Sequence, residues 1–144
     1  MHNQEPDFCG WATKFNTRCT DGRTILDGSF SHQDGAQIPL VYMHKHDNPM
    51  NNLGYAILEN RPGEGVYAYG FLNNTPQGQN MKEQLMHGDI KSMSIWANQL
   101  NETGMPGAKY VRHGQIQELS LVLAGANPGA KIESVFAHSD EFGD

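Results

Sequence analysis

The stretch LGYAILENRPGEGVYAYGFL, residues 53–72, contains two runs of apolar, aromatic and β-branched residues separated by a short segment with Pro62 and Gly63. Runs of this composition, bounded by proline and glycine, are typical of β-strands joined by tight turns. We therefore predict strands at residues 53–59 and 65–72, and a fold built mainly from strands.

The rest of the chain extends this pattern. Sixteen glycines and seven prolines are spread along 144 residues, and further strands are expected at 8–15, 38–44, 90–100 and 115–125. The segment TGMPGAK, residues 103–109, is expected to be a loop. Because many short strands leave many exposed edges, the simplest architecture is a closed or nearly closed antiparallel β-barrel with one or a few helices, an α+β fold.

One helix is predicted in TPQGQNMKEQLMHGD, residues 75–89. Thr75 can cap its start, Pro76 suits the first helical position, and Gly88 can adopt the left-handed conformation that ends a helix. Met81, Leu85 and Met86 form an apolar stripe, which we assign to core packing.

Size and composition limit the classes of protein. A length of 144 residues predicts a single domain, with flexible ends at residues 1–6 and in the acidic tail 137–144. The formal charge of −6 argues against nucleic-acid binding, and no apolar run is long enough to span a membrane. Two cysteines, Cys9 and Cys19, are expected to be buried, reduced thiols.

His44 and His46, in VYMHKHDNP (residues 41–49), have the spacing of a two-histidine metal site. Alternate residues of a strand point to one face, so both rings could share an ion. A stable site needs a third and usually a fourth ligand, and residues 48–51 are Asn, Pro, Met and Asn. We expect no metal and no cofactor, although a metal- or ligand-binding barrel that uses His44 and His46 stays an alternative.

The second interpretation gives one histidine a role as general base, which requires a nucleophile and an acid. Strand alternation in IKSMSIWA places Ser92, Ser94 and Trp96 on one face of residues 90–97. Glu118 opens the almost continuously apolar run of residues 118–125, where an ionised carboxylate needs a partner or water.

Four segments, in order, resemble the prohead (head maturation) proteases of tailed bacteriophages. They are DGSF (27–30), the strand IPLVYMH (38–44), the helix and strand up to IKSMSIWA (90–97), and QIQELSLVLAGANPGA (115–130). The resemblance runs from about Phe8 to Ile132. It implies a fold of the herpesvirus maturational protease type and the chemistry of a serine protease.

The resemblance implies particular roles for three residues. Ser94 falls on the nucleophile, His44 on the base and Glu118 on the acid, with Asp89 and His113 as the other candidates for the acid. The loop GANPGA, including Gly125, Ala126 and Asn127, falls near the oxyanion hole and contains no arginine. Trp96 and Ser92 stand where the family often has glycine.

The resemblance also implies a substrate and a setting. The protein would cleave scaffold and major capsid protein segments, and possibly itself, inside the phage procapsid, which assembles in the bacterial cytoplasm. It is expected to form a homo-oligomer. The alternative within the same fold is an assembly domain with weak or conditional proteolysis.

Overall fold

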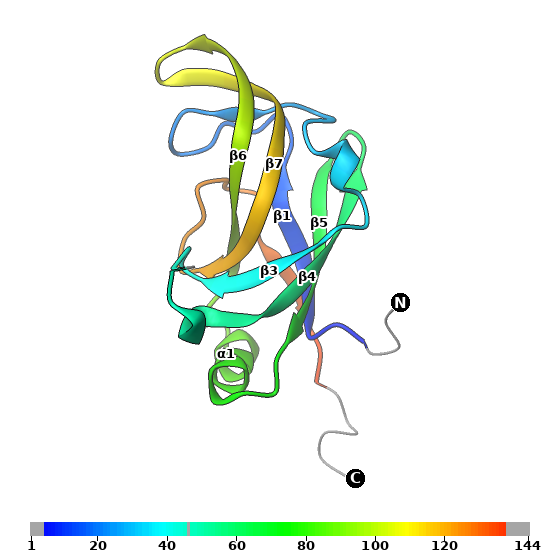
Figure 1. Cartoon of the computed structure of the whole chain (residues 1–144), viewed down its shortest axis with the longest axis vertical. Helices are drawn as coiled ribbons and strands as arrows, with labels where there is room; N and C mark the ends of the chain where they lie inside the picture. Colours follow the sequence, from blue (N-terminus) through cyan, green and yellow to red (C-terminus); the bar gives the residue numbers. More distant parts are fainter. Residues whose placement is uncertain (1–4, 46, 138–144) are drawn as a thin grey trace.

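The computed structural model describes residues 5–45 and 47–137. Within them the chain forms mainly β-strands, as predicted, with one α-helix and two short 3-10 turns (Figure 1). The strands are β1 (Phe8–Lys14), β2 (Thr24–Ile25), β3 (Gln37–Tyr42), β4 (Asn52–Arg61), β5 (Gly65–Leu72), β6 (Ser92–Met105), β7 (Ala108–Val122) and β8 (Ile132–Val135). The α-helix is α1 (Pro76–His87), and the 3-10 turns are η1 (Ser31–Gln33) and η2 (Pro49–Asn51).

The strands join in the order β2-β7-β3-β4-β5-β1-β8, and β6 pairs with β7 off this path. The closed barrel that we expected is not confirmed, because this path is open. One isolated bridge, Ser92 to Lys131, connects the start of β6 to the residue before β8. The expectation of an antiparallel sheet is wrong at two pairings, since β7 runs parallel to both β2 and β3. A chain segment containing β4, β5, α1 and β6 connects β3 to β7 and makes this parallel pairing possible.

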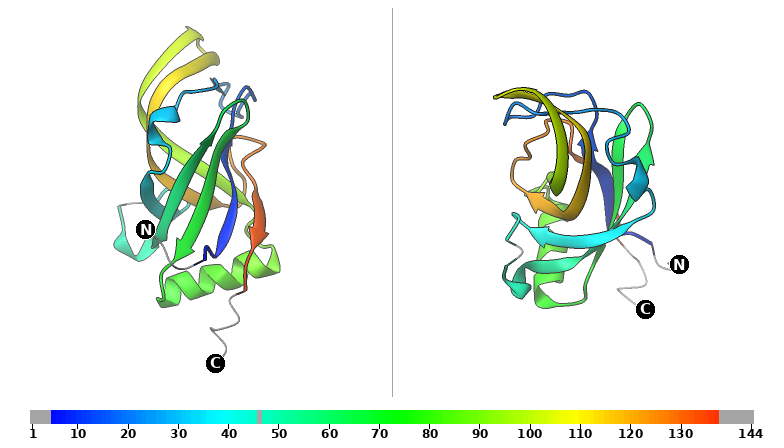
Figure 2. Two further views of the ribbon diagram at one scale, coloured as in Figure 1. Left: turned by 90° about the vertical axis from the view of Figure 1, so that its right-hand side faces the viewer. Right: turned by 45° about the horizontal axis from the view of Figure 1, so that its top comes forward.

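β6 and β7 form one long hairpin, which extends past the other strands in Figures 1 and 2. The prediction of a loop at residues 103–109 is therefore wrong, because β6 continues to Met105 and β7 starts at Ala108. Positive φ angles at Gly104 (106°) and Gly107 (81°) let the chain turn in fewer residues than we assumed. The strand at 65–72 is confirmed at both ends, whereas β2 and β8 were missed because they are too short to show alternation.

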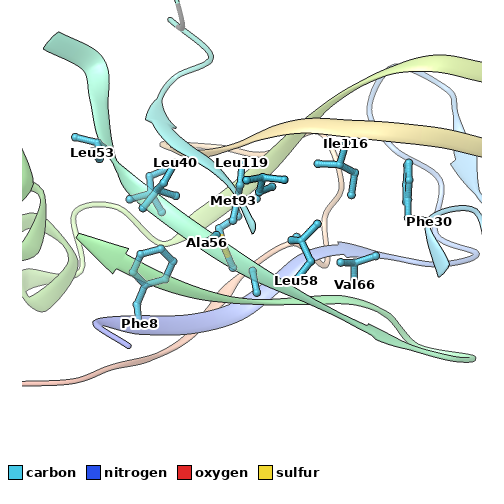
Figure 3. Packing of buried hydrophobic residues seen from close by; sticks show 14 of the residues in the cluster. Phe8, Phe30, Leu40, Leu53, Ala56, Leu58, Val66, Met93, Ile116 and Leu119 are labelled. Atoms are coloured by element: carbon cyan, nitrogen blue, oxygen red, sulfur yellow. The ribbon is translucent and has the colours of Figure 1, made fainter. Parts of the chain in front are cut away.

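The core lies on the inner face of the curved sheet (Figure 3). Its fully buried strand residues come from β1, β3, β4, β5, β6 and β7 and include Phe8, Leu40, Leu58, Met93 and Leu119. Met93 precedes Ser94, and Leu119 lies between Glu118 and Ser120. Alternation along each strand thus anchors one side chain in the core and turns its neighbours to the opposite face of the sheet.

Helix α1 was predicted with its correct ends. The Thr75 side chain accepts a hydrogen bond from the backbone N–H of Gly78 (3.1 Å), and Gly88 is left-handed with φ 83°. Met81 and Leu85 are buried in the core cluster, but Met86 is 52% exposed, so its place in the apolar stripe is wrong. At 100° per residue, Met86 turns away from the face that packs against β4 and β5.

A buried ion pair fixes α1 to the start of the sheet. Lys82 Nζ donates to Asp7 Oδ1 at 2.8 Å, and the second oxygen of Asp7 accepts from the N–H of Leu72 at 2.7 Å. Both charged side chains are only 11% exposed. The pair joins the helix, β5 and the segment before β1.

Lys82→Met is expected to lower the free energy of unfolding by about 3 kcal/mol, because it leaves the buried Asp7 carboxylate without its cation. Urea unfolding followed by circular dichroism measures the change. Lys91→Met, at an exposed lysine, is the matched control and should change stability by less than about 0.5 kcal/mol. Equal effects of the two variants would contradict a stabilising role for the pair.

Candidate active site

Three neighbouring strands bring the predicted site residues together. β7 lies between β3 and β6, with Val41 opposite Ser120 on one side and Ser94 opposite Ser120 on the other. Trp96 pairs with Glu118 in the same β6–β7 ladder. The end of β3, the start of β6 and the last third of β7 therefore meet at one place.

The sequence predicts a strand at residues 38–44 that includes His44, but His44 lies in a turn after the end of this strand. β3 ends at Tyr42, and Met43 and His44 adopt left-handed conformations with φ 52° and 59°. This conformation is disfavoured for residues other than glycine. Here it is held by two hydrogen bonds to β7, Met43 N to Leu121 O (3.2 Å) and His44 N to Ser120 Oγ (2.9 Å). The turn, rather than strand alternation, aims the imidazole at β6.

The His44 ring bridges the two other predicted residues. Its Nε2 lies 2.9 Å from Ser94 Oγ, and its Nδ1 lies 3.0 Å from Glu118 Oε1. Both distances are those of hydrogen bonds. The structure thus brings His44, Ser94 and Glu118 into one continuous chain of polar contacts.

The three side chains in this chain of contacts differ in burial. The Glu118 side chain is 4% exposed and the His44 side chain 31% exposed, while Ser94 is half-buried. The carboxylate is therefore shielded from water, and the His44 ring lies between it and the serine. The serine at the outer end remains accessible.

Ser120 also belongs to this group, and sequence reasoning missed it. Its Oγ lies 3.0 Å from both His44 Nδ1 and Glu118 Oε1, and it accepts from the backbone N–H of His44. The side chain is fully buried. Its signal was present in the sequence, since Ser120 is two residues after Glu118 and must share its face of the strand.

A hollow of about 520 Å³, partly open to solvent, adjoins Ser94. Ala126 and Asn127 line it together with Ser94, and the rest of the wall is mostly apolar: Ala12, Ile25, Phe30, Ile95 and Val111.

The loop expected to contain the oxyanion hole lies next to β6, the strand that carries Ser94. A Cβ added to Gly125 would come within 2.5 Å of the carbonyl oxygen of Met93, so only glycine allows this approach. The Asn127 amide donates to Thr13 Oγ1 and to the Lys14 carbonyl, both at 2.9 Å. The Asn127 side chain thus fixes the loop to β1.

Cys19 lines the same hollow but has the wrong chemistry for a second nucleophile. Burial raises the pKa of its thiol, and the neighbouring Asp21 carboxylate raises it further. The reactive form of cysteine is the thiolate. At neutral pH Cys19 is therefore a weaker nucleophile than a cysteine whose pKa is not raised. Cys9 and Cys19 are buried and unbridged.

The metal interpretation finds no support in the part of the chain that the structure describes. Residues 5–45 and 47–137 contain no group of three or more His, Cys, Asp or Glu side chains placed to hold an ion. In His44, Nε2 contacts Ser94 Oγ and Nδ1 contacts Glu118 Oε1. His46, the second member of the proposed pair, lies outside the described residues, as do residues 1–4 and 138–144 of the predicted flexible ends.

The remaining residues singled out in the sequence lie at or away from the site. Trp96 is 41% exposed and sits two residues after Ser94 in β6. Ser92 pairs with Val122 and with Lys131. Asp89 follows α1, with its N–H bonded to Gln84 O, and His113 stacks on His32 with ring centroids 4.6 Å apart. Neither of these two replaces Glu118 beside the His44 ring.

A histidine between a buried carboxylate and an accessible serine hydroxyl is the arrangement of serine hydrolases, which occurs on several unrelated folds. The chain belongs to the family of caudovirus prohead serine proteases, whose sequence model matches residues 1–143. The resemblance inferred from the sequence is thereby confirmed. No curated protein matches the chain.

The fold is similar to that of a solved herpesvirus protease, described as KSHV protease in complex with a hexapeptide phosphonate inhibitor. The TM-score is 0.58 at 14% sequence identity, over 93% of this chain and 65% of that one. The predicted relation to herpesvirus proteases holds for the fold. This chain thus spans about two thirds of the length of that protease. Among the described residues no helix is long and apolar enough to cross a membrane.

Proposed function

We propose that the protein is a serine endopeptidase in which Ser94 is the nucleophile, His44 the general base and Glu118 the acid that orients it. The observation that carries the proposal is the double contact of the His44 ring, 2.9 Å to Ser94 Oγ and 3.0 Å to Glu118 Oε1. Membership in a family of serine proteases supports the same chemistry.

The reaction follows from these contacts. His44 Nε2 takes the proton of the Ser94 hydroxyl as its oxygen attacks the peptide carbonyl, and Glu118 stabilises the imidazolium that forms. His44 then protonates the leaving amine, and an acyl-enzyme remains on Ser94. Water, deprotonated by His44, attacks this ester and restores the free serine.

The loop of Gly125, Ala126 and Asn127 is the proposed source of the oxyanion hole. Backbone N–H groups of this loop would face the negative oxygen, since the Asn127 side chain is bound to Thr13 and Lys14. The hollow next to Ser94 supplies room for part of the polypeptide substrate.

The family name supports a proposal for the biological setting. We propose that the substrates are segments of the scaffold and major capsid protein, and possibly the protease itself, and that cleavage takes place inside the procapsid in the bacterial cytoplasm. Self-association of the protease belongs to the same proposal. No cofactor enters any step of the mechanism.

A fluorophosphonate probe tests the chemistry without knowledge of the substrate. The Ser94 oxygen should form a bond to phosphorus and expel fluoride, so the chain gains the mass of one phosphonyl group. Tryptic mass spectrometry should find the label on Ser94. Ser92→Ala, which changes the serine two positions earlier, should be labelled at the wild-type rate; label on another residue would contradict the assignment.

The same sample separates the alternatives drawn from the sequence. A metal-binding barrel that uses His44 and His46 would contain near-stoichiometric metal by elemental analysis and would not react with the probe. An assembly domain with weak proteolysis would react slowly in isolation and faster on co-assembly with capsid protein. Rapid labelling of the metal-free protein supports the protease.

A further inference from the structure

Ser120 makes three hydrogen-bond contacts within the site. A hydroxyl has one proton to donate and two lone pairs to accept with. Ser120 Oγ contacts Glu118 Oε1 at 3.0 Å, His44 Nδ1 at 3.0 Å and the backbone N of His44 at 2.9 Å. Its side chain is fully buried, so water does not replace any of these partners.

The direction of each bond follows from the chemistry of the partners. The backbone N–H of His44 can only donate, and the carboxylate of Glu118 can only accept. Ser120 therefore gives its proton to Glu118 and has one lone pair left, which faces His44 Nδ1. With the ring proton on Nδ1, this proton can be shared between Glu118 Oε1 and Ser120 Oγ, and every one of these contacts joins a donor to an acceptor.

The opposite tautomer leaves an unfavourable contact. With the proton on Nε2, the Nδ1 lone pair would face Glu118 Oε1 at 3.0 Å, acceptor against acceptor. Ser120 has one proton and could relieve only one of these two atoms. The hydroxyl thus favours the tautomer that leaves Nε2 free to accept the proton of Ser94.

Ser120 also holds the backbone of the base. His44 has a left-handed φ of 59°, which costs free energy in a residue that carries a Cβ. The bond from His44 N to Ser120 Oγ ties this turn to β7, the strand that carries Glu118. One hydroxyl therefore fixes both the ring and the main chain of His44 relative to the acid.

We propose that Ser120 is a positioning residue that sets the tautomer and the orientation of His44. The inference rests on the proposed function, because it assigns Ser120 to the proton transfer between Ser94 and His44. Ser120 touches no reacting atom; it acts through His44 and Glu118.

Ser120→Ala tests the role through inactivation by the fluorophosphonate probe, with the maximal rate kinact and the half-saturation constant KI measured separately. The loss of one oriented hydroxyl is expected to lower kinact by about 10- to 100-fold. KI should stay within about threefold, because the probe does not contact Ser120. Ser120→Thr, which keeps the hydroxyl, should recover at least part of kinact.

Ser29→Ala is the matched control. Its hydroxyl is equally buried and lies 2.6 Å from the carbonyl oxygen of Leu26 and 2.8 Å from that of Val111, which compete for its one proton, away from the three proposed catalytic residues. A comparable loss of stability with unchanged kinact would separate positioning from general destabilisation. Equal kinact in wild type and Ser120→Ala would overturn the inference, whereas a wild type that does not react at all would overturn the proposed protease itself.

A measurement on the wild type does not depend on the folding of any variant. The ¹⁵N shifts of the His44 ring, at a pH where the imidazole is neutral, report which nitrogen carries the proton. We expect the Nδ1–H tautomer. An Nε2–H tautomer would overturn the inference even if the protein labels normally on Ser94.

Discussion

Ser94→Ala is expected to abolish cleavage of the capsid precursor while leaving the fold unchanged. The methyl group of alanine has no oxygen to attack the carbonyl, and the loss of a triad member typically lowers turnover by a factor of about 10⁴ or more. Ser94 is half-buried and its hydroxyl is uncharged, so replacing this hydroxyl by hydrogen leaves no buried charge without a partner. Co-expression of the variant with capsid protein and scaffold, followed by gel electrophoresis, measures the effect.

Ser92→Ala serves as the control for this experiment. Ser92 lies on the same face of β6, but its partners in the ladder are Val122 and Lys131 rather than His44. Processing should proceed as in the wild type. Normal processing by Ser94→Ala would show that the nucleophile is another residue.

The second large effect is expected from Glu118→Gln, which preserves the size of the side chain but removes its charge. The imidazolium formed on His44 would lose its buried counter-charge, so turnover should fall by about 100-fold or more. The rates at which the fluorophosphonate inactivates the wild type and Glu118→Gln measure this loss of reactivity. Circular dichroism should remain that of the wild type.

A glutamate elsewhere in the sheet provides the comparison. Glu59 bonds to Arg61 at 2.8 Å and to Tyr69 at 3.0 Å, and its side chain is 44% exposed. Glu59→Gln should react at the wild-type rate. Near-normal rates in Glu118→Gln would mean that the histidine works without this acid.

The sequence predicted the features that depend on local signals. Thr75, Pro76 and Gly88 mark the ends of α1 because helix capping uses residues within one turn of the end. β5 was predicted at both ends, since aromatic and β-branched residues fill it between Pro62 and the helix. The loop at 103–109 failed because the pairing that extends β6 and β7 is set by the partner strand, which composition does not encode.

The site, too, combines features that the sequence predicts with features that depend on the pairing of distant strands. Strand alternation could not choose between His44 and His46, and only the resemblance to prohead proteases selected His44. The left-handed turn at Met43 and His44 was not predictable, because neither residue favours that conformation and a hydroxyl on β7 stabilises it. Ser120 lies two residues after Glu118 in the sequence, but its contacts with His44 require the parallel pairing of β3 with β7.

The position of β7 between β3 and β6 has a consequence for timing. The contacts of His44 join it to residues 50 and 74 positions later in the chain. A ribosome-bound fragment that ends before β7 has neither Glu118 nor Ser120, and its β3 and β6 have no common partner strand. The three proposed catalytic residues therefore come together only after synthesis has passed Val122 and β7 has docked between β3 and β6, so a fragment that ends earlier is expected to be inactive.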